Sequence, residues 1–126
     1  MAQAQHEHFK HCTMCGTSWR DLAEFVTDFQ LRVEGYQACF PQPDLGLVML
    51  THRADGCGTT LAVAAAELRP LYDGPEFTEH RVGQDDCEKH CLQVKDIEEC
   101  DVECDMAWIR TVMQYLRRHE LPAHMK

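Results

Sequence analysis

Seven of the eight cysteines in this 126-residue chain fall into two spaced sets that could bind metal ions. The first set joins Cys12-x-x-Cys15-Gly16 to His52-x4-Cys57-Gly58, and the second set is Cys87-x3-Cys91-x8-Cys100-x3-Cys104. Thiolate and imidazole groups are the ligands of zinc, and four thiolates also hold iron–sulfur clusters. Both sets therefore predict metal sites.

The first set (Cys12, Cys15, His52 and Cys57) has the composition of a Cys3His zinc site. In Cys-x-x-Cys-Gly the chain turns tightly enough for both sulfurs to face one ion, and the glycine permits the backbone conformation that follows. The 36 residues between Cys15 and His52 can hold a helix and a β-hairpin, which would return His52 and Cys57 to the first turn. His11 is an auxiliary ligand candidate beside Cys12.

Other interpretations of these residues stay open at this stage. Cys12 and Cys15 could form a dithiol redox pair, although the βαβ unit expected around such a pair is missing. His52 could be a polar strand end, and Cys57 a small buried thiol. Cys39 has no paired partner, so we expect it in the core and outside both sets.

The second set (Cys87, Cys91, Cys100 and Cys104) consists of two i, i+4 pairs. A helix places such residues on one face, so two short helices joined by residues 92–99 would gather four sulfurs. Zinc or an iron–sulfur cluster fits this ligand set. Disulfides between the paired helices, a pattern of small oxidised import proteins, and buried thiols are the alternatives.

The second set lies in a strongly acidic segment. Residues 85–105 hold nine acidic residues against only Lys89 and Lys95. Such surroundings oppose free thiolates, whereas a bound cation would supply the compensating positive charge. For an iron–sulfur cluster, the same carboxylates would lower the reduction potential.

The elements that must position these residues indicate an α+β fold. We expect a small antiparallel sheet with an N-terminal helix before it and a C-terminal helical, hairpin-like segment after it. Ser18 and Asp21 resemble a capping box, and the strands are separated by the turn signal at 41–44. The expected helices are 18–29, a short one at 64–72 and 101–119, and the expected strands are 36–40, 45–52 and 59–63.

Length and charge restrict the class of protein. We expect one domain over residues 1–126, with an α+β metal-binding part at about 12–75 and a helical cysteine-rich part at 76–126. The formal charge of −9 disfavours nucleic acid and anionic membranes as partners. Since the sequence has neither an apolar membrane-spanning run nor a signal-like N-terminus, we expect a soluble, cytoplasmic protein with reduced cysteines.

The overall pattern resembles a group of small uncharacterised bacterial cysteine-rich proteins. The likeness covers most of the chain and implies a fold with cysteine sites, but no activity. A narrower likeness is to zinc-ribbon knuckles, from which the His52 ligand departs. The residues that carry the resemblance are Cys12-Thr13-Met14-Cys15-Gly16, Gly35-Tyr36-Gln37, His52, Cys57-Gly58-Thr59-Thr60-Leu61, Leu71-Tyr72-Asp73-Gly74-Pro75 and the second set.

These patterns favour a metal-binding protein with a structural or interaction role. Zinc is the favoured metal, and a protein partner of unspecified type is compatible with that role. An iron–sulfur redox protein, or a redox or metal sensor, is the alternative. Enzymatic activity is not favoured, because Cys57 and His52 have no third residue to complete a catalytic group.

Overall fold

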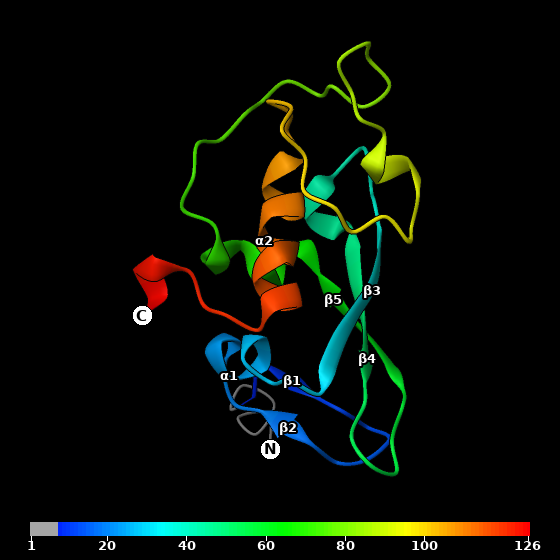
Figure 1. Cartoon of the computed structure of the whole chain (residues 1–126), viewed down its shortest axis with the longest axis vertical. Coiled ribbons are helices and arrows are strands. Elements are labelled where there is room, and N and C mark those ends of the chain that lie inside the picture. Colours follow the sequence, from blue (N-terminus) through cyan, green and yellow to red (C-terminus); the bar gives the residue numbers. More distant parts are fainter. Residues whose placement is uncertain (1–7) are drawn as a thin grey trace.

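The computed structural model describes residues 8–126 and confirms a mixed α+β architecture, in which helix α2 packs against an antiparallel sheet (Figure 1). A small two-stranded ribbon and a short helix lie below them in this view. Short 3-10 turns occupy Pro43–Leu45, Ala65–Leu71, His90–Leu92 and Ala123–Met125. The main elements are β1 (Lys10–His11), β2 (Ser18–Trp19), α1 (Leu22–Val26), β3 (Leu31–Gln37), β4 (Leu47–His52), β5 (Thr60–Ala64) and α2 (Ala107–Arg118).

The three-stranded sheet has the order β3-β4-β5 with antiparallel neighbours. Its register pairs Leu31 with His52 and Thr51 with Thr60. Alternate residues of a strand face the same side, so His52 shares the buried face of β4 with Val48 and Leu50. The register thus places a histidine on the core side of the sheet, at the end of its central strand.

Helix α2 covers this buried face with an apolar stripe that is typical of an amphipathic helix. Its C-terminus is fixed to the sheet, because His119 donates a hydrogen bond from Nε2 to the Leu31 carbonyl oxygen at 2.6 Å. Within residues 8–126 no helix is both long and apolar enough to cross a membrane. The α2 residues buried in the common hydrophobic core are Ala107, Trp108, Ile109, Val112, Met113 and Leu116.

The predicted N-terminal helix at 18–29 is confirmed only in its centre. Ser18 and Trp19 belong to a strand, and the residue that caps α1 is Asp21, whose carboxylate accepts from the Glu24 N–H at 2.8 Å. The helix ends at Val26 with Thr27 as its C-cap, and Asp28 accepts from the Gln30 N–H at 2.8 Å in the turn that follows. Phe29 consequently lies outside the helix, with 81% of its surface exposed.

The predicted strands 45–52 and 59–63 correspond to β4 and β5, and the short helix at 64–72 forms as a 3-10 turn. The first strand was placed too late, at 36–40 instead of Leu31–Gln37. Its buried residues Leu31, Val33 and Tyr36 do not alternate strictly, because a bulge between Val33 and Gly35 shifts the pattern.

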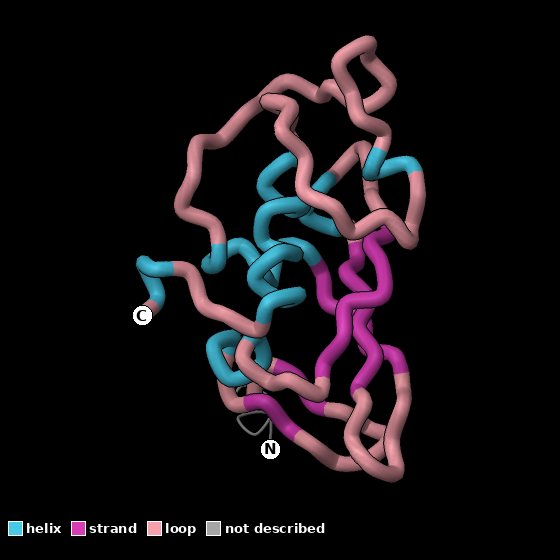
Figure 2. Tube along the Cα trace, viewed as in Figure 1, coloured by secondary structure: helices cyan, strands magenta, loops and turns pink. Residues whose placement is uncertain are grey.

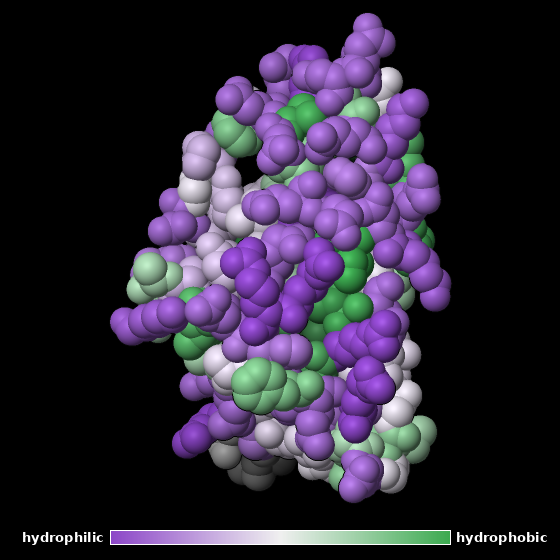
Figure 3. Space-filling view, viewed as in Figure 1, coloured by the Kyte–Doolittle hydropathy of each residue, from purple (hydrophilic) through white to green (hydrophobic). Residues whose placement is uncertain are grey.

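The predicted helical hairpin at the second set is not formed among the described residues. Residues 76–106 form a long loop with one 3-10 turn, and α2 begins at Ala107 rather than near 101 (Figure 2). A helix over 98–105 would put Glu99 beside Glu103 and Asp101 beside Asp105, and such like-charged i, i+4 pairs are unfavourable. The upper end of the molecule, where this loop lies, presents mainly hydrophilic side chains in the space-filling view (Figure 3).

Candidate metal centre

The first set lies where two β-hairpin turns meet at the lower end of the molecule. The turn between β1 and β2 carries Cys12 and Cys15, while the turn between β4 and β5 carries His52 and Cys57. Both turns lie side by side at the lower edge of the view (Figure 1). Lys10 strengthens this arrangement by donating from Nζ to the Ala62 carbonyl oxygen at 2.8 Å.

The first turn folds tightly around its two cysteines. The Cys12 carbonyl oxygen accepts from the Gly16 N–H at 2.8 Å, and the Cys12 N–H donates to the Thr17 carbonyl oxygen at 2.7 Å. Gly16 has a φ of +85°, a conformation that side chains disfavour. These bonds hold both sulfurs on the same side of the turn.

The second turn closes by the same means. The Gly58 N–H donates to the His52 carbonyl oxygen at 2.8 Å, and the His52 N–H donates to the Thr59 carbonyl oxygen at 2.9 Å. Gly58 has a φ of +105°. The expected role of glycine after each knuckle cysteine therefore matches the backbone at both turns.

The ligand atoms of the first set have the spacing of one tetrahedral ion. All four lie within 4.8 Å of one another. Cys12 Sγ is 3.6 Å from Cys57 Sγ, and Cys15 Sγ is 3.4 Å from His52 Nδ1. Around tetrahedral zinc, two sulfurs stand about 3.8 Å apart and a sulfur and a nitrogen about 3.5 Å apart. The predicted Cys3His group is therefore present and could hold a metal ion.

Burial and hydrogen bonding differ among the three thiols. Cys12 is buried, Cys57 is half-buried and Cys15 is exposed. Hydrogen bonds from the Thr17 hydroxyl and backbone lower the pKa of Cys15 to about 6. A backbone hydrogen bond from Thr59 lowers the pKa of Cys57, but burial and hydrogen bonds with Cys12 and Cys15 raise it overall. The hydrogen bonds from Thr17 thus favour the thiolate of Cys15, whereas the surroundings of Cys57 favour its thiol unless a cation replaces the proton.

The imidazole of His52 is fully buried, with Nδ1 directed at the sulfurs. Within the described part of the chain, its Nε2 has no hydrogen-bond partner. The Trp19 ring packs against this imidazole, and Trp19 is itself held by a hydrogen bond from Nε1 to Asp28 Oδ2 at 2.8 Å. A metal on Nδ1 would give the buried ring a polar function that explains its place in the core.

Two further residues singled out in the sequence stand outside this group. His11 is hydrogen bonded through Nδ1 to the Ser18 hydroxyl at 2.7 Å and is not among the four clustered ligands. Cys39 is half-buried just beyond the end of β3 and belongs to neither set.

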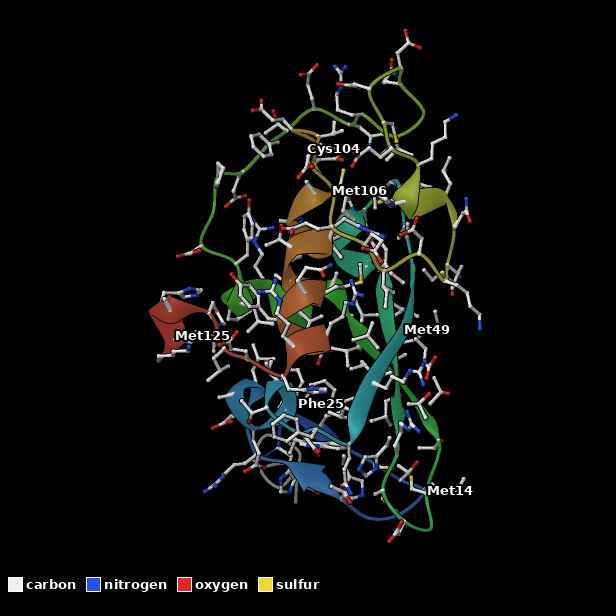
Figure 4. The ribbon with its side chains drawn as sticks, viewed as in Figure 1. Met14, Phe25, Met49, Cys104, Met106 and Met125 are labelled. Carbon is white, nitrogen blue, oxygen red and sulfur yellow. The ribbon has the colours of Figure 1, made fainter. Side chains whose placement is uncertain are left out.

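The second set lies at the other end of the molecule. Figure 4 labels Met14, between the two knuckle cysteines, at the lower end, and Cys104 near the upper end beside Met106. Cys104 is buried and the other three thiols are half-buried. Within residues 8–126 the four sulfurs of the second set do not converge within single-ion distance, whereas the ligand atoms of the first set do. All eight cysteines are free thiols, so the alternative disulfides are not formed.

Cys104 instead has neighbours that the sequence pattern did not indicate. His80 Nδ1 lies 2.9 Å from Asp105 Oδ1, and both residues group with the Cys104 sulfur as potential ligands. The Arg81 N–H donates to Cys104 Sγ at 3.3 Å. No local spacing relates His80 to Cys104, because they are 24 positions apart in the chain, so only the folded chain reveals this group.

Comparisons of the chain with protein-family models, curated proteins and solved structures find no match.

Proposed function

We propose that this is a zinc-binding protein whose Cys3His centre is structural. The observation that carries the proposal is the convergence of the four ligand atoms of the first set from two hairpin turns, within 4.8 Å of one another. Three thiolates and one imidazole are a preferred ligand set of structural zinc. Four protein ligands also complete a tetrahedron, which leaves no open position for a substrate or an activated water.

The zinc would tie the N-terminal ribbon to the sheet. Within the ribbon, Phe9 and Trp19 are joined by a backbone hydrogen bond of 2.8 Å, and both rings pack on Phe25 of α1. Zinc bound to the first set would add a crosslink between this unit and the β4–β5 turn. In a chain of this size, such a link contributes directly to folding free energy.

We further propose that the protein works in the reducing environment of the cytoplasm, where its thiols stay free to bind metal. A role in binding another protein is part of the same proposal, because a closed centre of four protein ligands favours a structural or interaction role over catalysis. The net charge of −9 makes nucleic acid an unfavourable partner.

The test compares Cys15→Ser with Cys39→Ser, which removes a thiol outside both sets. We expect one zinc ion per chain in the purified protein and in Cys39→Ser, measured by elemental analysis. Cys15→Ser should lose most of this zinc and several kcal/mol of stability, a drop in Tm of more than about 10 °C. Full zinc content together with an unchanged Tm in Cys15→Ser would contradict the proposal.

A further inference from the structure

The loop that carries the second set is held in a defined place although it has little regular structure. The Tyr36 N–H on β3 donates to the Val94 carbonyl oxygen at 2.8 Å. From α2, Arg110 Nε donates to the Glu98 carbonyl oxygen at 3.0 Å, and Gln114 Nε2 donates to that of Ile97 at 3.0 Å. The loop is thus fastened to both layers of the fold.

This fastening brings the two halves of the second set together. The Asp101 N–H donates to Glu88 Oε1 at 3.4 Å, so the residues next to Cys87 and Cys100 are in contact. Cys91 and Cys104 both pack against the hydrophobic core.

Two of the residues that hold this loop carry buried donors without partners within residues 8–126. Arg110 is fully buried, and its Nη1 makes no full hydrogen bond, while Nε and Nη2 are bound to the loop. Tyr36 is also fully buried, and its hydroxyl has no partner. The Arg110 guanidinium carbon lies 5.9 Å from the centre of the Tyr36 ring.

Both donors belong to residues that hold the segment between the two cysteine pairs. Arg110 donates to the carbonyl oxygens of Asp96 and Glu98, and the Tyr36 N–H donates to the carbonyl oxygen of Val94. A neutral thiol is a weak acceptor, whereas a metal-bound thiolate or sulfide accepts well. A buried cation and a buried hydroxyl are therefore arranged around a position suited to anionic sulfur.

We propose that the second set ligates an iron–sulfur cluster, with Arg110 and Tyr36 donating hydrogen bonds to its sulfur atoms. Four cysteines are the usual ligands of such clusters, and the buried guanidinium offsets part of their negative charge. Among the described residues these four sulfurs do not converge within 4.8 Å, which argues against a single zinc ion. A cluster places iron atoms between its thiolates, so its ligands stand farther apart than those of the first set.

The direct test is the composition of anaerobically purified protein, compared among wild type, Cys100→Ser and Cys39→Ser. We expect wild type and Cys39→Ser to contain iron and acid-labile sulfide, with visible absorption that bleaches when dithionite adds an electron. Cys100→Ser should lose both iron and absorption but keep the zinc of the first set, which shows that it still folds. The first site and its proposed role are thus tested separately.

Three outcomes of this experiment would overturn the cluster. A second zinc ion without sulfide would assign a mononuclear site to the second set. Four alkylatable thiols, or two disulfides found by mass mapping of the anaerobic protein, would leave the set without metal. In each case the iron content of wild type would match that of Cys100→Ser.

The donor roles are tested by the reduction potential of the cluster. Tyr36→Phe removes only the hydroxyl. Arg110→Lys keeps the positive charge but removes the planar guanidinium group and its N–H donors. Since hydrogen bonds to cluster sulfurs favour the reduced form, we expect both variants to shift the potential to more negative values. Tyr72→Phe, whose hydroxyl donates to the Pro75 carbonyl oxygen, is the matched control and should leave the potential unchanged. Unchanged potentials in Tyr36→Phe would exclude its hydroxyl as a donor.

Discussion

The Trp19 ring meets the His52 imidazole nearly edge-to-face, with ring centroids 5.0 Å apart and planes inclined by 75°. Both residues are buried, and Trp19 also contacts Phe25 in an edge-to-face pair. The histidine of the candidate metal centre is therefore oriented by the hydrophobic core of the N-terminal region. A metal bound to His52 would therefore be coupled to the packing of the core through this pair.

Because of this contact, Trp19 fluorescence should report on zinc at the first set. In Trp108→Phe, where Trp19 is the remaining tryptophan, removing zinc with a chelator should change the emission intensity or wavelength. In Trp19→Phe, the emission of Trp108, which lies on α2, should stay the same during that titration. An identical response in both variants would show that the change comes from general unfolding rather than from the site.

The thiol of Cys15 should be unusually reactive in the metal-free protein. Hydrogen bonds from Thr17 lower the pKa of Cys15 to about 6, and the reactive thiolate becomes more populated as the pH rises through that value. We expect its rate of alkylation, followed by mass spectrometry, to have a midpoint near this pH. Thr17→Ala should move the midpoint upward, and zinc should suppress the reaction. A midpoint that Thr17→Ala leaves in place would contradict the role of Thr17.

Gly16→Ala should weaken both stability and zinc affinity. At a φ of +85° with open space around the position, the added methyl group costs only backbone strain, about 1–2 kcal/mol. Gly83→Ala is a matched control, because Gly83 has the same φ and no crowding but lies far along the chain from the first set. It should lose similar stability in urea unfolding while keeping the zinc affinity of wild type. Equal zinc affinities in the two variants would argue against the first turn as a ligand-bearing knuckle.

Gly35→Ala should loosen the loop of the second set. A Cβ at this position would lie 2.5 Å from the Val94 carbonyl oxygen, so the loop or the strand must shift. We expect a loss of about 1–3 kcal/mol in urea unfolding, as for other overpacked positions. Glu34→Ala, at the neighbouring position of β3, should change stability by less than about 0.5 kcal/mol. If Gly35→Ala is as stable as wild type, the loop does not hold its place against β3.

The first set could be predicted from the sequence because its signals are local. Cysteine spacing and the glycines after Cys15 and Cys57 define two tight turns, and a metal needs only that the turns meet. The helix prediction began too early, because Ser18 and Asp21 resemble a capping box while Ser18 and Trp19 pair with His11 and Lys10 in a strand. Local periodicity cannot show such a pairing between two short strands.

The second set was harder to predict because long-range contacts determine its backbone. The i, i+4 spacing indicates helices, but the loop bonds to Arg110 and Gln114 of α2 and to Tyr36 of β3 instead. Nothing in the local pattern marks Arg110 as the buried partner of a loop. The two partnerless donors likewise become visible only after folding.

The coordination of one zinc ion by Cys12, Cys15, His52 and Cys57 can be measured directly. X-ray absorption at the zinc edge of the purified protein tests it most directly, because it counts the ligand atoms and measures their distances. We predict three sulfur neighbours at about 2.3 Å and one nitrogen neighbour at about 2.0–2.1 Å, with the nitrogen lost in His52→Ala. A shell of four sulfurs, or a shell dominated by oxygen, would contradict the claim.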